Sequence, residues 1–258
     1  MALPPILYHH FRVPLPYAQT LALQERIHQI QLAARRTGSH KDVLLLLQHR
    51  PVYTAGRRQT EDAVAAERRR LTDMGADFVT TQRGGQLTYH GPGQVVGYPL
   101  IDTGRWAPAM GVRDYVCRMQ KFIGLHLRAA HGLQPSPSDN TGVFLSPTEK
   151  IASIGVQVRH RLTSHGFAMN ITREPLAWFD QVVACGLEDV KAVSISSATG
   201  KDVSVDEEIP GLVSRFGQLY ERDMAALDAP KEGEIGEAIL ALEEEAHSLG
   251  SWATSPRM

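Results

Sequence analysis

The sequence predicts a single domain of the α+β class, in which helices and strands form packed layers. Three observations lead to this. The chain has 258 residues, 43% of them hydrophobic, which is enough for one substantial core. Segments with helical spacing of hydrophobic residues are interleaved with short strand-like runs. The composition turns acidic from Ala226 onward, so we expect residues 1–225 to form the domain and residues 226–258 a peripheral helix with a disordered end.

The first part of the chain contains two expected helices and two expected strands. Residues 17–36 predict an amphipathic helix, because hydrophobic residues recur at helical spacing at Leu23, Ile27, Ile30 and Ala34. The continuous apolar run at 43–47 is too short for a typical helix and predicts a strand buried on both faces. A short helix at 61–74 and a strand at 77–81 then lead into a glycine-rich segment.

The second half begins with a helix around 112–131, indicated by the spacing of Val112, Val116, Met119 and Ile123. A short strand is expected at 143–145. Residues 150–158 and 162–171 are both strand-like and close together, which predicts a hairpin. A last helix of the domain is expected to begin at a capping box that starts with Ser204.

Composition excludes several classes of protein. The chain has 27 basic and 28 acidic residues, so it carries no overall positive field for nucleic acid. No run approaches the ~20 apolar residues that span a bilayer, so we expect no membrane insertion and a location in the bacterial cytoplasm. Two cysteines, Cys117 and Cys185, are a poor disulfide framework and are treated as separate thiols. No pair of the eleven histidines, His9-His10 included, has the metalloprotease helix spacing with a glutamate, and two isolated cysteines do not favour a structural zinc site, so we predict no metal.

A glycine-rich segment carries the strongest functional signal. It reads Arg83-Gly84-Gly85-Gln86-Leu87-Thr88-Tyr89-His90-Gly91-Pro92-Gly93-Gln94. Glycine lets a backbone approach a ligand closely and proline fixes φ, so the side chains between them follow a defined, irregular path. This composition indicates the wall of a binding pocket. A glycine-rich hairpin connection is the structural alternative.

Residues 83–93 resemble the signature loop of the lipoyl(octanoyl) transferase family. Further segments resemble that family in the same chain order, and they are 48–57, 150–156, 165–170 and 184–186. Arg50, Ala55 and Ala184 depart from the commonest residues of the family. The resemblance therefore extends from about Leu47 to Ser196.

The resemblance implies a fold and an activity. The fold would be a mixed sheet flanked by helices, like that of the biotin and lipoate protein ligases and the class II synthetases. The domain at 1–225 would be an acyltransferase that moves an octanoyl or lipoyl group from acyl carrier protein to a lysine of a lipoyl domain. Acceptors would be the E2 subunits of 2-oxoacid dehydrogenases and the glycine cleavage H protein. Neither ATP nor a metal would be needed, and a monomer is the default state.

The same resemblance assigns the catalytic residues. Cys185 would accept the acyl group as a thioester, and small neighbours on both sides would leave its sulfur accessible. Because an ordinary cysteine has a pKa near ~8.5, its thiolate needs a nearby base or cation, and Lys150 is the matching residue. Lys150 would either stabilise the thiolate as an ammonium group or accept its proton. By residue type alone, a buried cysteine and a solvated strand-edge lysine remain the alternatives.

Three segments would form the substrate pocket. The expected substrate-binding residues are Arg83, Gly84, Gly85, Gln86, Leu87, Thr88, Tyr89, His90, Ser153, Ile154, Gly155, Gly166, Phe167 and Ala168. Phe167 and Ile154 suit an apolar chain. His49 and His165 are expected to support the site, and hydrogen-bonded structural histidines are the alternative for both.

Two other functions remain open at this stage. An ATP-dependent lipoate or biotin ligase of the same fold would activate a free acid and would need no cysteine. The glycine loop does not match the arginine-rich loop of the biotin ligases, and Cys185 with Lys150 favours direct transfer. A noncatalytic module that binds acylated proteins would keep the pocket without requiring either residue.

Overall fold

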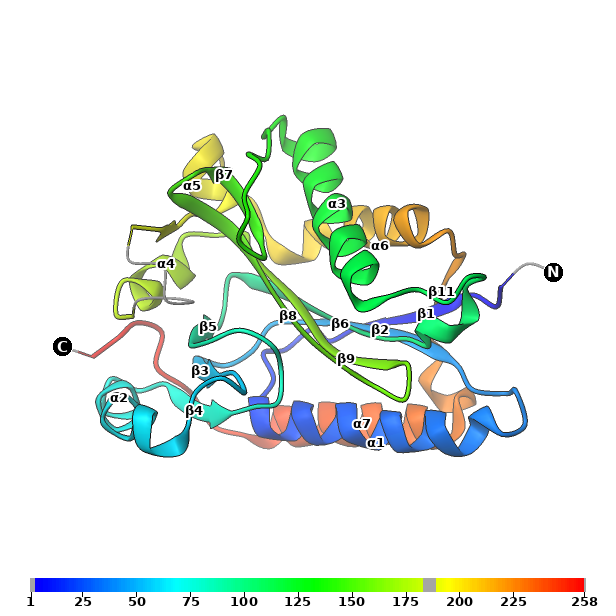
Figure 1. Cartoon of the computed structure of the whole chain (residues 1–258). Helices are drawn as coiled ribbons and strands as arrows, with labels where there is room; N and C mark the ends of the chain where they lie inside the picture. Colours follow the sequence, from blue (N-terminus) through cyan, green and yellow to red (C-terminus); the bar gives the residue numbers. More distant parts are fainter. Residues whose placement is uncertain (1–2, 183–188, 258) are drawn as a thin grey trace.

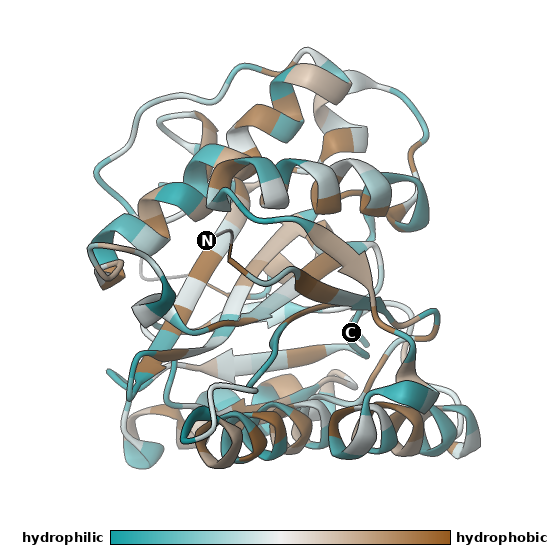
Figure 2. Ribbon diagram, turned by 90° about the vertical axis from the view of Figure 1, so that its right-hand side faces the viewer, coloured by the Kyte–Doolittle hydropathy of each residue, from teal (hydrophilic) through white to brown (hydrophobic). Residues whose placement is uncertain are grey.

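A computed structural model describes residues 3–182 and 189–257. The protein has two layers of helices with a large mixed sheet between them, and a small sheet beside one end (Figure 1). Figure 2 shows the sheet between the helical layers from the side. Among the described residues, no helix is both long enough and apolar enough to cross a membrane.

The large sheet has the strand order β10-β8-β9-β6-β2-β1-β11, with β7 paired to β8. Its central strands β2, β6, β9 and β8 are antiparallel neighbours, whereas β1 runs parallel to both β2 and β11. The strands span Ile6–His10 (β1), Asp42–Leu47 (β2), Gln94–Leu100 (β6), Val143–Ser146 (β7), Glu149–Arg159 (β8), Leu162–Asn170 (β9), Lys191–Ala192 (β10) and Met224–Ala226 (β11).

Helices cover both faces of this sheet (Figure 1). One face carries α3 (Val112–His131), α5 (Ile195–Thr199) and α6 (Val205–Tyr220), and the other carries α1 (Tyr17–Arg35) and α7 (Gly233–Ser248). Strand β2 connects the two cores, because Leu44 and Leu46 face one layer and Val43, Leu45 and Leu47 face the other. The prediction of a strand buried on both faces is confirmed.

The small sheet has the order β4-β3-β5 and its own hydrophobic cluster. It consists of β3 (Val52–Ala55), β4 (Asp77–Thr80) and β5 (Thr88–His90), and it packs with α2 (Glu61–Asp73) and α4 (Glu174–Phe179). Short 3₁₀ turns at Thr103–Arg105 and Ala229–Lys231 complete the described elements. The small sheet presents the glycine-rich segment to the large one.

Local sequence signals account for several helix ends. The Ser204 side chain accepts a hydrogen bond from the Glu207 backbone N–H, which is one of the two bonds of the predicted capping box. Helix α3 ends at Gly132, which takes the left-handed conformation that glycine adopts without strain. The predicted helices at 17–36, 61–74 and 112–131 and the predicted hairpin agree with α1, α2, α3 and β8–β9.

The segment after Ala226 packs more closely than the composition suggests. Helix α7 lies along α1 and buries one face, which consists of Ile235, Ile239, Leu242 and Ala246, while its glutamates occupy the outer side. The Arg257 backbone N–H donates to the Met74 carbonyl at 3.0 Å, so the chain returns to the end of α2. The division of the chain at residue 225 stays a prediction.

Gly166 is a position where a side chain should disrupt the large sheet. A Cβ at Gly166 would lie 2.1 Å from the Gly97 carbonyl oxygen of β6, and backbone cannot move aside cheaply. We expect Gly166→Ala to lower the free energy of unfolding by about 2 kcal/mol or more. Urea unfolding followed by circular dichroism measures this. Gly250→Ala is the control, since nothing lies within 4 Å of its Cβ position, and equal midpoints for the two variants would contradict the expectation.

Candidate active site

A cavity of about 440 Å³ lies between the β8–β9 hairpin and the segment at 83–90. Its volume falls within the range of ligand pockets, about 300–1,000 Å³. Most of the predicted site residues line it together, namely Arg83, Gly84, Gly85, Gln86, Thr88, His90, Lys150, Ser153, Ile154, Gly155, His165, Gly166, Phe167 and Ala168. Segments that lie up to 85 positions apart in the sequence, from Arg83 to Ala168, thus meet at one site.

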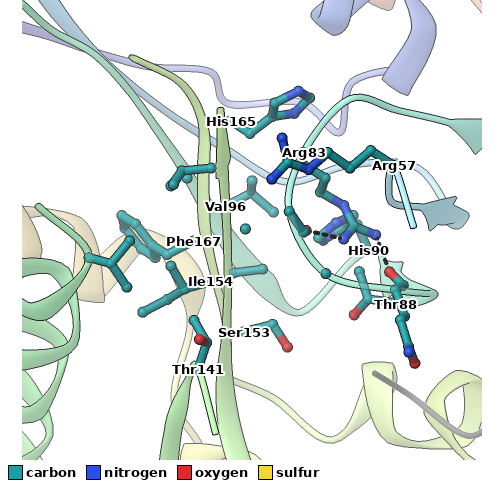
Figure 3. Close-up of a pocket in the computed structure, with 18 of the residues that line it drawn as sticks. Arg57, Arg83, Thr88, His90, Val96, Thr141, Ser153, Ile154, His165 and Phe167 are labelled. Atoms are coloured by element: carbon teal, nitrogen blue, oxygen red, sulfur yellow. Dashed lines mark hydrogen bonds between the residues drawn. The ribbon is translucent and has the colours of Figure 1, made fainter. Parts of the chain in front are cut away.

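Paired residues of β8 and β9 form one wall of the pocket. Ile154 lies opposite Phe167, and Gly155 lies opposite Gly166. Figure 3 shows Phe167 and Ile154 on the side of the pocket away from Arg83 and Arg57. A Cβ at Gly155 would lie 2.9 Å from the Gly84 carbonyl oxygen, so glycine is needed where the loop crosses β8.

Arg83 holds the glycine-rich loop against the small sheet. Its guanidinium donates to the Thr54 hydroxyl and carbonyl, and to the Gln86 carbonyl at 2.8 Å. The side chain is 6% exposed. These bonds orient the backbone of the glycine-rich loop.

Leu87 and Tyr89 lie on the opposite face from the pocket, which corrects their predicted place in its wall. Successive side chains of a strand point to opposite faces, so Thr88 and His90 face the cavity and their neighbours face away. Tyr89 stacks on Trp178 with ring centroids 5.4 Å apart, and Leu87 belongs to the same hydrophobic cluster. Both residues support the small sheet.

A chain of side-chain amides orients His90. His90 Nδ1 is 2.8 Å from Gln94 Oε1, and the Gln94 amide donates to Asn170 Oδ1 at 2.8 Å. Asn170 then donates to the Val193 carbonyl. Because an amide oxygen accepts only, Nδ1 of His90 carries the proton. Burial lowers the His90 pKa well below its usual value, and the nearby Arg83 guanidinium adds to the shift, so the ring is neutral near pH 7.

The two expected supporting histidines occupy different places. His165 lines the pocket, with a positive φ of 58° and its backbone N–H bonded to Gln24, and burial lowers its pKa to about 3. His49 lies behind the pocket wall, where it bonds to the Leu15 carbonyl and, at 2.7 Å, to the hydroxyl of the pocket residue Tyr98. His49 thus positions Tyr98 without lining the cavity.

Burial of neutral His49 predicts acid-sensitive stability. Its pKa is lowered to about 4 by burial, against ~6.5 in an unfolded chain, so the unfolded state binds the proton first as the pH falls. Stability is therefore lost as the pH falls from ~6.5 toward 4. Between pH 7 and pH 5 this one residue should remove about 2 kcal/mol from the free energy of unfolding.

His49→Gln tests this contribution. Glutamine can bond to Leu15 and Tyr98 and does not titrate. Urea unfolding at pH 7 and pH 5 should therefore show a smaller loss in the variant than in the wild type. The same loss in both proteins would contradict the assignment.

Lys150 is held at the edge of the pocket. The residue is 8% exposed, with Nζ 5.5 Å from the centroid of the Phe144 ring. Its carbonyl accepts from the Val193 N–H, and Ala192 of β10 pairs with it. The alternative of a solvated strand-edge lysine does not describe this environment. Cys185 lies outside the described residues, and in the sequence it precedes β10 by six positions.

Sequence reasoning missed part of the pocket lining. The further lining residues are Tyr17, Arg57, Arg58, Val96, Tyr98, Val112, Val116, Asp139, Asn140, Thr141 and Val156. Arg57 and Val156 are the two residues of this set that lie within segments resembling the family. The others come from elements whose place around the cavity depends on how the sheets pack.

Residues 16–217 match the family model described as the lipoyl protein ligase A/B catalytic domain. The chain belongs to this family. Its relatives include an octanoyltransferase of Koribacter versatilis (strain Ellin345), which is 35% identical over 204 residues covering 76% of this chain and 78% of the relative. A protein of Danio rerio named octanoyl-[acyl-carrier-protein]:protein N-octanoyltransferase LIPT2, mitochondrial, is 36% identical over 206 residues, covering 80% and 88% of the two chains. The resemblance drawn from the motifs is confirmed.

A solved structure supports the fold. Lipoate-protein ligase A bound with ATP aligns with a TM-score of 0.64 and 18% identity, covering 98% of this chain and 99% of that one. At this identity the likeness concerns the fold alone. The predicted α+β fold class of the lipoate and biotin ligase type is confirmed.

Among the residues that the structure describes, one group of side chains has ligand atoms close enough together to hold a metal ion. His126, His131 and Glu208 lie between α3 and α6 with these atoms within 4.8 Å of one another, and none of the three lines the pocket. Both imidazoles bond to Glu208 Oε2, at 2.5 and 2.9 Å. The two hydrogen bonds connect helix α3 to helix α6, and this structural role accounts for the cluster. The expectation that no metal is required stays a prediction.

Proposed function

We propose that this protein transfers an octanoyl group from octanoyl-acyl carrier protein to a lysine of a lipoyl domain. The observation that carries the proposal is the pocket itself, where segments that separately resemble the family line one cavity. The names of relatives at 35% and 36% identity support the same reaction. The protein would thus be an acyltransferase of protein lipoylation.

In the proposed first step, the Cys185 thiolate attacks the thioester carbonyl of the donor. A C–S bond forms to Cys185 and the bond to the carrier sulfur breaks, and the carrier leaves as a thiol with the proton that the Cys185 thiol gave up when it became a thiolate. The product is an octanoyl-cysteine thioester. Exchange between two thioesters is nearly neutral in energy, so this step requires no ATP.

In the proposed second step, the amine of the acceptor lysine attacks the octanoyl-cysteine carbonyl. An amide bond forms, Cys185 leaves as a thiolate, and the nitrogen loses a proton. Lys150 lies at the pocket and is fixed by β10 and the Phe144 ring, so it is suited to receive that proton or to stabilise the thiolate. The neutral His90 and His165 would contribute hydrogen bonds and no charge.

The apolar wall suits the acyl chain. Phe167 is 2% exposed and Ile154 is 9% exposed, and with Val96 they supply hydrocarbon surface. The lipoyl domains of 2-oxoacid dehydrogenase E2 subunits and the glycine cleavage H protein are the proposed acceptors. A monomeric state, a cytoplasmic location and independence of ATP and metal are further proposals.

Transfer assays with two donors test the function. Purified protein and an unmodified lipoyl domain are incubated with octanoyl-acyl carrier protein without ATP, or with octanoate and ATP, and the domain is weighed by mass spectrometry. We expect the mass of one octanoyl group in the first reaction only. Product from octanoate and ATP alone would indicate a ligase, and stoichiometric binding without product would indicate a noncatalytic module.

A further inference from the structure

Positive charge is concentrated at the pocket. The chain as a whole is balanced, with 27 basic and 28 acidic residues. Among the residues that the structure describes, in contrast, the cavity is lined by the cations Arg57, Arg58, Arg83 and Lys150 and by one carboxylate, that of Asp139. A local excess of this kind attracts an anionic ligand. Arg83 bonds to the loop backbone and Lys150 is buried, which leaves Arg57 and Arg58 as the two exposed cations.

The turn that carries these two arginines is fixed against the glycine-rich loop. The Arg57 backbone N–H donates to the Arg83 carbonyl at 3.1 Å, and the Gln59 N–H donates to the Gly56 carbonyl at 3.0 Å. A Cβ at Gly56 would lie 2.3 Å from the Gly85 carbonyl oxygen, so the turn and the loop touch through backbone. The arginine side chains therefore project from a turn that is hydrogen-bonded to the glycine-rich loop.

Neither guanidinium is engaged by the described part of the protein. Arg57 and Arg58 make no side-chain hydrogen bond and no ion pair with residues 3–182 or 189–257. Arg68 and Arg70 of the neighbouring helix α2 differ, since they pair with Glu61 and Glu67. Two guanidinium groups on a rigid turn are suited to phosphate, which they bind through paired N–H donors.

We propose that Arg57 and Arg58 form a subsite for the phosphate of a phosphopantetheine arm. This inference rests on the proposed function, because such an arm carries the acyl thioester of a carrier protein. Figure 3 shows Arg57 on the side of the pocket opposite Phe167 and Ile154. The donor would therefore place its phosphate at the cationic rim and its acyl chain on the apolar wall. Coenzyme A carries the same phosphopantetheine arm, so the subsite would recognise the phosphate of an acyl-carrier protein and of an acyl-coenzyme A alike.

Small donors with and without the phosphate test the subsite. The octanoyl thioesters of pantetheine and of phosphopantetheine differ by that group alone. Initial rates of transfer to a lipoyl domain are measured for the wild type and for the double variant Arg57→Gln, Arg58→Gln. We expect the variant to raise KM for the phosphorylated donor about tenfold or more, with kcat nearly unchanged and with KM for octanoyl-pantetheine unaffected.

The matched control is Arg69→Gln, which removes one exposed charge from α2 outside the pocket and should alter neither donor. The subsite would be overturned if the double variant changed KM equally for both small donors, or if it changed KM for neither. Octanoyl-carrier protein and octanoyl-coenzyme A then separate the sources of the arm. A rise in KM for both supports recognition of the arm, whereas a rise for the carrier protein alone would assign the arginines to its protein surface and contradict the proposal.

Calorimetric titration with phosphopantetheine alone separates failure of the subsite from failure of the proposed function. We expect the double variant to bind about tenfold more weakly than the wild type, whichever acyl reaction the protein performs. Equal affinities would overturn the subsite. A wild type that binds the arm but transfers from no donor would contradict the proposed function and leave the phosphate subsite supported.

Discussion

Cys185→Ser is expected to lower the rate of octanoyl transfer by about 10³-fold or more. A serine hydroxyl is far less acidic than a thiol, so it supplies almost no nucleophilic anion near neutral pH. It also forms an oxygen ester, which an amine attacks more slowly than a thioester. Both proposed steps are therefore impaired. The measurement is the initial rate of lipoyl-domain modification with octanoyl-acyl carrier protein as donor.

Cys117→Ser is the matched control for this substitution. Cys117 lies half-buried in α3 and does not line the pocket, so its replacement should leave the rate within about twofold. Comparable activity of the Cys185 variant and the wild type would exclude a thioester at that residue. Equal losses in the two variants would indicate that general damage, and not loss of the nucleophile, causes the effect.

Lys150→Met is expected to lower the transfer rate by about 10²- to 10⁴-fold, the range over which a positioned acid or base contributes. Methionine keeps an unbranched apolar stem beside the Phe144 ring and removes the ammonium group. The strand pairing with β10 uses backbone, so the fold should be retained. Initial rates together with unfolding midpoints separate a chemical effect from a structural one.

Two further measurements refine the role of Lys150. Lys121→Met, which removes an exposed charge from α3 outside the pocket, should leave the rate unchanged. Alkylation of Cys185 by iodoacetamide at several pH values reports its thiolate fraction. If Lys150 stabilises the thiolate, the apparent pKa of Cys185 should rise in the Lys150 variant. An unchanged alkylation profile with slow transfer would instead assign proton transfer to the lysine, and full transfer activity would remove Lys150 from the mechanism.

Much of the fold follows from local patterns that the sequence displays directly. The run at 43–47 lacks alternation because β2 is covered by helices on both faces. Helix α3 spans the residues that the hydrophobic spacing predicts. Strands β1 and β11 were not predicted, since β1 carries two histidines and β11 has only three residues. Both form strands by pairing in parallel within the sheet, β1 with β2 and β11 with β1, and this pairing is not visible in the local sequence. Helix α7 was expected at the periphery because its glutamates dominate the composition and conceal its buried face.

The site was predictable where one short segment contributes neighbouring residues. It was less predictable where the alternation of side chains along a strand decides which residues face the cavity. Thr88 and His90 face the cavity and Leu87 and Tyr89 do not, a distinction that requires the extent of β5. Tyr17 and Tyr98 reach the pocket from α1 and β6, and their contribution depends on tertiary packing. His49 was expected near the site and lies one contact away, behind Tyr98.

The central claim is that the acyl group passes through Cys185, and peptide mass spectrometry tests it most directly. The protein is incubated with octanoyl-acyl carrier protein without ATP or acceptor, digested, and analysed before and after hydroxylamine. We predict one octanoyl adduct on the Cys185 peptide, removed by hydroxylamine and discharged by an unmodified lipoyl domain. Transfer to the lipoyl domain with no adduct on Cys185, or with an adduct that the domain does not discharge, would contradict the account.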